Sequence, residues 1–222
     1  AMVENPSTQH ALWLWLLGDD RGELLHRSQK IETALAPAFN MLQVTEGFRY
    51  GSDRDLTGYE DGTENPVDEA AVEAAIVANA GPGLDGGCFV AVQQWQHDLN
   101  GFAALPQAEQ DNIIGRRLSD NEELEDAPAS AHVKRTAQES FSPEAFTVRR
   151  SMPWTENGKS GLMFVSFSRT LNAFEVQLRR MSGLEDGIVD GLYRYSRPLS
   201  GGYYWCPPMK DGHMDLSAVR PA

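Results

Sequence analysis

The sequence predicts an α+β fold built from two similar units of strands and helices. Strand-like and helix-like segments alternate within the first fifty residues, and they alternate again after residue 146. A long irregular segment rich in Gly, Asp and Glu lies between the two stretches, at residues 51–66. Such alternation favours sheets that pack against helices within each unit.

The first unit is expected to contain a strand, a helix and a second strand. The apolar, Trp-rich run at 11–17 predicts the first strand, and Leu and Ile at helical spacing predict a helix over 21–35. Asp20 with Glu23 three residues later has the spacing of a capping box at the start of that helix. The second strand is expected at 39–50.

The rest of the chain is expected to carry the second sheet and its helices. Residues 51–66 and the Gly-rich stretch 81–87 predict loops, and the acidic stretch 119–130 predicts irregular structure. The expected strands are 88–95, 146–154 and 162–168, and the expected helices are 70–80, 105–116 and 170–181.

Composition excludes several classes of protein. Hydrophobic residues make up 41% and charged residues 23% of the chain, which is ordinary for a globular protein. The formal net charge of −13 disfavours nucleic acid and anionic membranes as partners. Cys88 and Cys206 are far apart and do not form a CxxC motif, so neither a zinc site nor a disulfide framework is predicted. A reducing, cytoplasmic environment is therefore expected.

The start of the chain gives little sign of targeting. The apolar run at 11–17 is shorter than the roughly 20 residues of a membrane span, and no basic segment precedes it. Ala1-Met2 is typical of what remains after removal of a tag, so an original N-terminus and an export signal stay open.

The most informative segment is GYEDGTENP at residues 58–66. Taken alone it is a turn-rich loop, because its glycines allow positive φ and its acidic groups favour solvent. The alternation of oxygen ligands that an EF-hand calcium loop requires is absent. A surface loop and a functional loop both fit this composition.

The GxxDG and TENP motifs of this loop resemble the signature loop of dye-decolorizing peroxidases. Further landmarks that resemble the bacterial B-type members follow in order: VQQWQHDL at 92–99, IGR at 114–116, AHV at 131–133 and RRSMP at 149–153. The resemblance covers about residues 11–208. It implies two ferredoxin-like units with antiparallel sheets, a haem b cofactor, and reduction of hydrogen peroxide coupled to oxidation of dyes or phenols.

The resemblance also implies the residues of the haem site. His132 is expected to be the iron ligand, since a neutral imidazole is the usual axial ligand in peroxidases, whereas His97 and the other histidines are expected to be structural. Asp61 is expected to move the peroxide proton, and Arg149 to stabilise charge on the leaving oxygen. Arg150 would point the opposite way from Arg149 in a strand.

A second set of residues is expected to contact the cofactor. Arg116 is the candidate partner of a haem propionate, although a role at the end of a helix fits it nearly as well. Ser151 stands where B-type members often carry Asn. Leu162 and Phe164 alternate on one strand face, so they are expected either to line the haem pocket or to pack in the core. Thr63 and Glu64 complete the set.

The chain departs from the family pattern in its first half. An upstream strand and helix of the family pattern are expected to be missing, so the expected organisation is a remainder of the first ferredoxin-like half at 1–50, the GxxDG loop and connecting helix at 51–87, and a haem-binding second half at 88–222. The exposed edge of an incomplete unit predicts a homo-oligomer. A haem-handling protein without useful turnover is the alternative function.

Overall fold

The computed structural model describes residues 3–219, which fall into two compact units. One unit comprises residues 3–9 together with 47–219, and the other comprises His10–Glu46. The helices and antiparallel strands of the larger unit confirm the α+β prediction.

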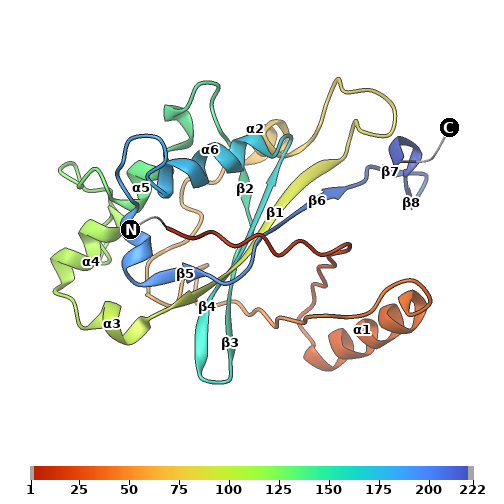
Figure 1. The fold of residues 1–222 in the computed structure, drawn as a ribbon, viewed down its shortest axis with the longest axis horizontal. Coiled ribbons are helices and arrows are strands. Elements are labelled where there is room, and N and C mark those ends of the chain that lie inside the picture. The colour runs from red at the N-terminus through yellow and green to blue at the C-terminus, as the bar shows by residue number, and fades with distance from the viewer. Residues whose placement is uncertain (1–2, 220–222) are drawn as a thin grey trace. The chain divides into compact units, whose positions relative to one another are not determined.

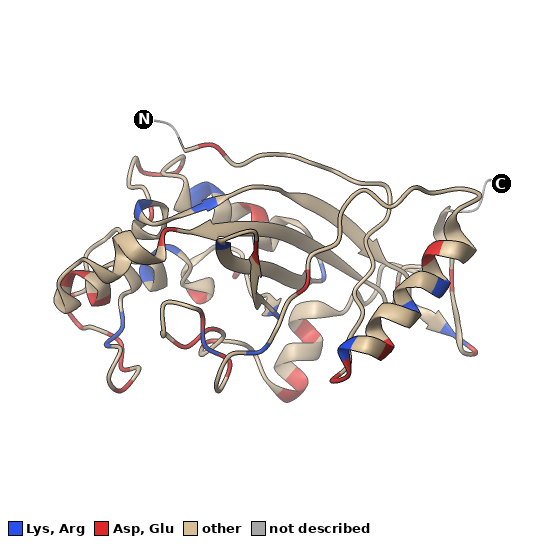
Figure 2. Ribbon diagram, turned by 90° about the horizontal axis from the view of Figure 1, so that it is seen from below, with Lys and Arg blue, Asp and Glu red and all other residues tan. Residues whose placement is uncertain are grey.

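The smaller unit contains one helix, α1 (Arg21–Leu35), with the bounds that the sequence predicts. Its N-cap is confirmed, because the Asp20 side chain accepts a hydrogen bond from the backbone N–H of Glu23 at 2.9 Å. The helix buries none of its residues. Acidic and basic side chains are interspersed along it (Figure 2).

The prediction of two strands that flank α1 is wrong. Residues 11–17 and 39–46 adopt no regular secondary structure, and the expected second strand leaves only an isolated bridge from Gly47 to Trp154. An apolar run becomes a strand only when a neighbouring strand satisfies its backbone N–H and C=O groups. Residues 11–17 and 39–46 have no such neighbour within the described chain.

The larger unit is organised around the long central strand β1 (Cys88–His97). β1 pairs antiparallel with β4 (Lys159–Ser168) on one side and with the successive strands β5 (Ser196–Pro198) and β6 (Gly202–Cys206) on the other. Figure 1 shows β1 between β4 and β6. The predicted strands 88–95 and 162–168 are confirmed and extend slightly further.

The predicted strand 146–154 is split in two. β2 (Val148–Arg149) and β3 (Met152–Glu156) both pair with β4, and the register continues unchanged across the interruption. A separate small hairpin joins β7 (Met209–Lys210) to β8 (His213–Met214).

Short helices connect the strands. They are α2 (Asp68–Ala75), α3 (Leu99–Ala103), α4 (Gln107–Ile114), α5 (His132–Arg135) and α6 (Asn172–Met181), with 3₁₀ turns η1 (Gln138–Ser140), η2 (Gly191–Arg194) and η3 (Ser217–Val219). The three helices predicted in this unit are confirmed with shorter bounds. α4, for example, ends at Gly115, which adopts a left-handed conformation.

The register assigns side chains to the two faces of the sheet. Arg149 lies opposite Ser166, so both share a face with Phe164 two residues away. α6 covers this face, because Phe174 contacts the ring of Phe164 at 5.8 Å between centroids (Figure 1). On the other face, Val148 packs against Ala74 and Ala75 of α2.

No helix between residues 3 and 219 combines the length and the apolar character that crossing a bilayer requires.

Candidate functional site

His132 is held by a buried carboxylate. It is the first residue of α5, and its Nδ1 lies 2.8 Å from Oδ2 of Asp190. The Asp190 side chain is fully buried, while 25% of the His132 side chain is exposed. Because a carboxylate accepts hydrogen bonds, Nδ1 donates, and the lone pair of Nε2 is left available to a metal ion.

Asp190 is fixed by its own neighbours. Its Oδ1 accepts a hydrogen bond from the backbone N–H of Leu192 at 2.8 Å, and its own N–H donates to the carbonyl of Met181. The next N–H, that of Gly191, donates to the carbonyl of Ser130 at 2.7 Å, two residues before His132. These bonds therefore hold the Asp190 carboxylate against the His132 imidazole in one orientation. Asp190 was not predicted as a site residue from the sequence. The sequence shows it only as an acidic residue between two glycine-containing turns.

Gly115 of the IGR motif sets the position of α5. Its φ of 97° belongs to the left-handed region, and a Cβ there would lie 2.3 Å from Cγ2 of Val133. Only glycine allows the end of α4 to approach the residue that follows His132. The motif thus positions the imidazole through backbone packing.

His97 is excluded as a ligand because both of its ring nitrogens are occupied. Nδ1 lies 2.7 Å from Oγ of Ser196, and Nε2 lies 3.0 Å from Oδ2 of Asp55. Only 3% of its side chain is exposed. His26 and His213 are exposed, the first on α1 and the second on β8.

The Asp55–His97 pair anchors the start of the GxxDG loop. Burial acts to raise the pKa of Asp55, but hydrogen bonds and charge from His97, with further hydrogen bonds from Thr57, hold it below its usual value. The Asp55 carbonyl also accepts a hydrogen bond from the Gly58 N–H, and the Asp55 N–H donates to the Tyr59 carbonyl. These two bonds close the turn. The segment that leads into Asp61 is therefore attached to the end of β1.

The GxxDG loop is irregular, as predicted, and it contacts the strand that carries Arg149. Gly62 has a φ of 78°, and a Cβ there would lie 2.8 Å from Nδ2 of Asn65. The Asn65 amide donates to the Arg149 carbonyl at 3.0 Å and accepts from the Arg149 N–H at 2.8 Å. The loop residues that follow Asp61 are thereby bonded to β2.

Arg149 and Arg150 differ in their surroundings. Nε of Arg149 is buried and has no hydrogen-bond partner within residues 3–219, whereas Arg150 is exposed and donates to the Arg149 carbonyl. Oγ of Ser151 and Oγ of Ser166 are also buried without partners in the described chain. The register places Arg149, Ser151 and Ser166 on one face of the sheet. Since buried polar groups are normally hydrogen-bonded, three such groups together indicate a ligand-facing surface.

Leu162 and Phe164 lie on this same face of β4, and both are half-buried. Phe164 packs against Phe174 of α6. The apolar wall and the unpaired polar groups thus belong to one side of the sheet.

Arg116 is engaged with carboxylates instead of standing free. Its guanidinium donates to Glu64 at 2.5 Å, to Glu123 at 3.3 Å and to the Asn121 carbonyl at 2.9 Å. Thr63 accepts a hydrogen bond from the Asn121 amide at 3.0 Å. Thr63, Glu64 and Arg116 therefore form one network between the GxxDG loop and the segment after α4.

Gln138 joins the three parts of the site. Its amide donates to the Glu64 carbonyl at 3.2 Å and accepts from the Thr147 N–H at 2.7 Å, and its side chain is buried. It follows α5 by three residues. The segment of His132, the loop of Asp61 and the strand of Arg149 are thus bonded to one another.

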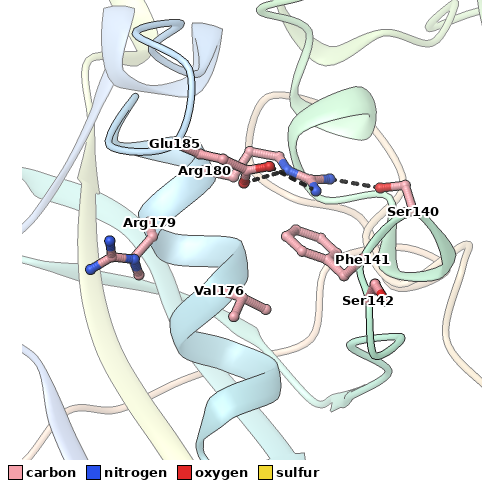
Figure 3. A pocket seen from close by; sticks show the side chains of 7 residues that line it. All are labelled: Ser140, Phe141, Ser142, Val176, Arg179, Arg180 and Glu185. Carbon is pink, nitrogen blue, oxygen red and sulfur yellow. Dashed lines mark hydrogen bonds and ion pairs between the residues drawn. The ribbon is translucent and has the colours of Figure 1, made fainter.

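A surface hollow of about 450 Å³ is lined by none of these residues. Arg180 is one of its lining residues (Figure 3). Arg180 bonds Glu185 and Ser140, and its guanidinium lies 3.4 Å from the centroid of the Phe141 ring. Arg179 points away from that ring.

Comparison with known proteins assigns the chain and its fold to one family. The family model described as Dyp-type peroxidase, C-terminal, matches residues 52–211. The dye-decolorizing peroxidase of Mycolicibacterium paratuberculosis is 34% identical over 91% of this chain and 59% of its own length. The corresponding protein of Mycobacterium tuberculosis is 31% identical over 91% of this chain and 62% of its own.

Solved structures agree. The dye-decolorizing protein from V. cholerae superimposes with a TM-score of 0.78 at 35% identity, over 85% of this chain and 63% of that one. A Rhodococcus jostii DypB variant in complex with heme gives a TM-score of 0.79 at 29% identity, with the same coverage. The chain spans about three fifths of the length of these relatives. By its family model, its relatives and its fold, the chain belongs to the Dyp-type peroxidase family.

Proposed function

We propose that this chain is the haem-binding part of a peroxidase that reduces hydrogen peroxide while it oxidises dyes or phenolic compounds. The observation that carries the proposal is the hydrogen bond from His132 to the fully buried Asp190. A carboxylate on Nδ1 fixes the ring and raises the basicity of Nε2, which is what an iron ligand needs.

The residues present fit haem b. Nε2 of His132 would supply the nitrogen ligand, and Nε of Arg149 and the hydroxyl groups of Ser151 and Ser166 are buried polar groups without a hydrogen-bond partner in the described chain. Leu162 and Phe164 offer an apolar wall on the same sheet face. The haem-binding second half is accordingly proposed at 88–222, with the GxxDG loop and connecting helix at 51–87 and the remainder of a first half at 1–50.

Two parts of the site have distinct tasks in this proposal. Haem, when bound, would supply the iron centre through which electrons pass from the organic donor to peroxide. Asp61 takes a proton from one peroxide oxygen and returns it to the other, and Arg149 stabilises the negative charge on the leaving oxygen. Ser151 helps to orient peroxide beside Arg149.

Arg116 is proposed to pair with a haem propionate at the edge of the site. Its side chain is only 11% exposed, and Glu64 and Glu123 hold its guanidinium in place. Thr63 and Glu64 then act on the cofactor through this network, because their own side chains bond Asn121 and Arg116.

The test is the absorption spectrum of the purified chain loaded with haem, before and after peroxide. A Soret band that shifts on addition of peroxide and returns on addition of a phenol supports a peroxidase. A band that stays unchanged while haem remains bound favours the haem-handling alternative. Loss of haem from the chain alone would contradict both.

We also infer that the chain self-associates and works in the cytoplasm. Support for the first comes from the unit His10–Glu46, whose large apolar side chains are exposed: Leu12, Leu14, Leu17, Leu25, Phe39, Met41, Leu42 and Val44. The two unlinked cysteines fit a reducing compartment. A solved relative from Mycobacterium smegmatis, 31% identical with a TM-score of 0.78, is described as an encapsulated DyP-type peroxidase.

A further inference from the structure

Two cysteines that are far apart in the sequence face each other across the sheet. Cys88 is the first residue of β1 and Cys206 the last residue of β6, and the antiparallel register makes them direct partners. Directly opposite residues put their side chains on the same face, with Cα atoms about 4.5 or 5.5 Å apart. Both spacings lie within the range of roughly 4.4–6.8 Å that a disulfide requires.

Both thiols are free, and their environments differ. Cys88 is buried, with 9% of its surface exposed, while Cys206 is half-buried. A hydrogen bond from Cys88 lowers the pKa of Cys206 to about 7, although burial opposes it. The same hydrogen bond, together with burial and the charge of Cys206, raises the pKa of Cys88. Cys206 is therefore the thiol that ionises more readily, and it is also the more accessible one.

We propose that Cys88 and Cys206 form a dithiol that hydrogen peroxide oxidises to a cross-strand disulfide. Hydrogen peroxide is the oxidant, and the reaction needs neither haem nor any residue of the haem site. The pair would thus be a second place where this chain reacts with peroxide, and a bond formed there would join β1 to β6.

The reaction proceeds in two balanced steps. First, the Cys206 thiolate attacks one peroxide oxygen, the O–O bond breaks, and the departing hydroxide takes up a proton to leave as water, which gives a sulfenic acid on Cys206. Second, the Cys88 sulfur attacks that sulfenic sulfur, an S–S bond forms, the S–O bond breaks, and a second water leaves with the Cys88 proton. Two thiols lose one electron each and peroxide gains two.

The order of the steps follows from the interaction between the two sulfurs and from their difference in exposure. The hydrogen bond with the Cys206 thiolate and its negative charge, which raise the pKa of Cys88 together with burial, are lost once Cys206 becomes a neutral sulfenic acid. Cys88 then ionises more readily beside the sulfur that it must attack. A buried resolving thiol next to a half-exposed attacking thiol also favours closure within the chain over exchange with another chain.

The experiment counts thiols in the reduced 222-residue chain after addition of hydrogen peroxide, with the remaining peroxide followed at each time point. We expect both thiols to disappear together, the intact mass to fall by two hydrogens, a non-reducing digest to yield the Cys88–Cys206 peptide, and dithiothreitol to reverse all three. Retention of both thiols under peroxide that consumes a free thiol would overturn the proposal, as would a disulfide that links two chains.

Matched single variants test the order. Cys88→Ser should leave Cys206 as a sulfenic acid that a dimedone probe captures, and Cys206→Ser should slow loss of the Cys88 thiol roughly tenfold. Equal rates in the two variants would show that Cys206 is not the attacking sulfur. If a variant does not fold, dimedone capture in the unmodified chain, located by peptide mass, decides the same question: a label on Cys206 supports the order and a label on Cys88 contradicts it.

Discussion

The side-chain amide of Asn65 binds both backbone polar groups of Arg149, so it completes for β2 the hydrogen bonds that a neighbouring strand would make. The two residues are 84 positions apart in the sequence. Asn65 closes the loop that begins with Gly58 and contains Asp61. The same amide therefore fixes the loop of the proposed proton carrier to the strand of the proposed charge stabiliser.

Asn65→Ala should separate these two elements. Its loss leaves the N–H and the carbonyl of Arg149 without partners, which should lower the free energy of unfolding by about 1–3 kcal/mol. We expect haem binding to persist and the reaction with peroxide to slow, because the loop that carries Asp61 is no longer bonded to β2 through Asn65. Urea unfolding and stopped-flow rates measure the two effects. Gln9→Ala is the matched control: its side-chain amide bonds the N–H and the carbonyl of Tyr203 in the same way, outside the GxxDG loop, and a slowing of the same size there would contradict a specific role for Asn65.

Arg149→Leu should leave haem bound and slow the reaction with peroxide by about 10²–10³. The guanidinium stabilises charge that develops only as the O–O bond breaks, so binding of the cofactor does not depend on it. Arg150→Leu is the control, since the Arg150 side chain is exposed and donates to the neighbouring Arg149 carbonyl. A larger loss at Arg150 than at Arg149 would reverse the assignment. Asp61→Asn should slow the same step.

His132→Ala should lower haem content sharply while the chain stays folded, because the iron loses its protein ligand. Asp190→Asn keeps the size of the side chain and removes the negative charge of the carboxylate that accepts from Nδ1 of His132, so haem affinity should fall by about 10–100-fold. Haem titration followed at the Soret band gives both values. Full haem content and an unchanged spectrum in the alanine variant would remove His132 as the ligand.

Asp55 makes the stability of the GxxDG loop depend on pH. Its pKa in the folded chain lies below the ordinary value of 3.8, so its ionised form stabilises the fold above that value, and this contribution is lost as the pH falls through the folded pKa. Asp55→Asn should therefore lower the free energy of unfolding at neutral pH. In acid, the difference in stability between the variant and the unmodified chain should shrink. Urea unfolding across the acidic range tests this. In a His97→Gln background the effect of Asp55→Asn should shrink, and a full-sized effect there would mean that His97 is not the partner that matters.

The features that sequence could predict are local ones. The bounds of α1 follow from the spacing of its leucines and the Asp20 cap, and β1 follows from a run of β-favouring residues closed by glycines. The strand predicted at 11–17 failed because a strand depends on a partner that the local sequence does not contain. The bond from His132 to Asp190 spans 58 residues and depends on two loops meeting, and the Cys88–Cys206 pair depends on strand register. Neither of these two contacts produces a periodic pattern in the sequence.

The unit His10–Glu46 should bring chains together. α1 buries none of its residues, and the segments around it expose leucine, phenylalanine and methionine side chains. Exposed apolar surface of this kind is stabilised by burial against another copy, and segments without strand partners can gain backbone hydrogen bonds in the same contact. Light scattering at low micromolar concentration should therefore give a clean multiple of the single-chain mass of 24.5 kDa. A double substitution, Leu14→Glu with Leu42→Glu, places charge on this surface and should shift the mass toward 24.5 kDa, whereas Leu184→Glu, on the larger unit, should not. A mass of one chain before any substitution would contradict self-association.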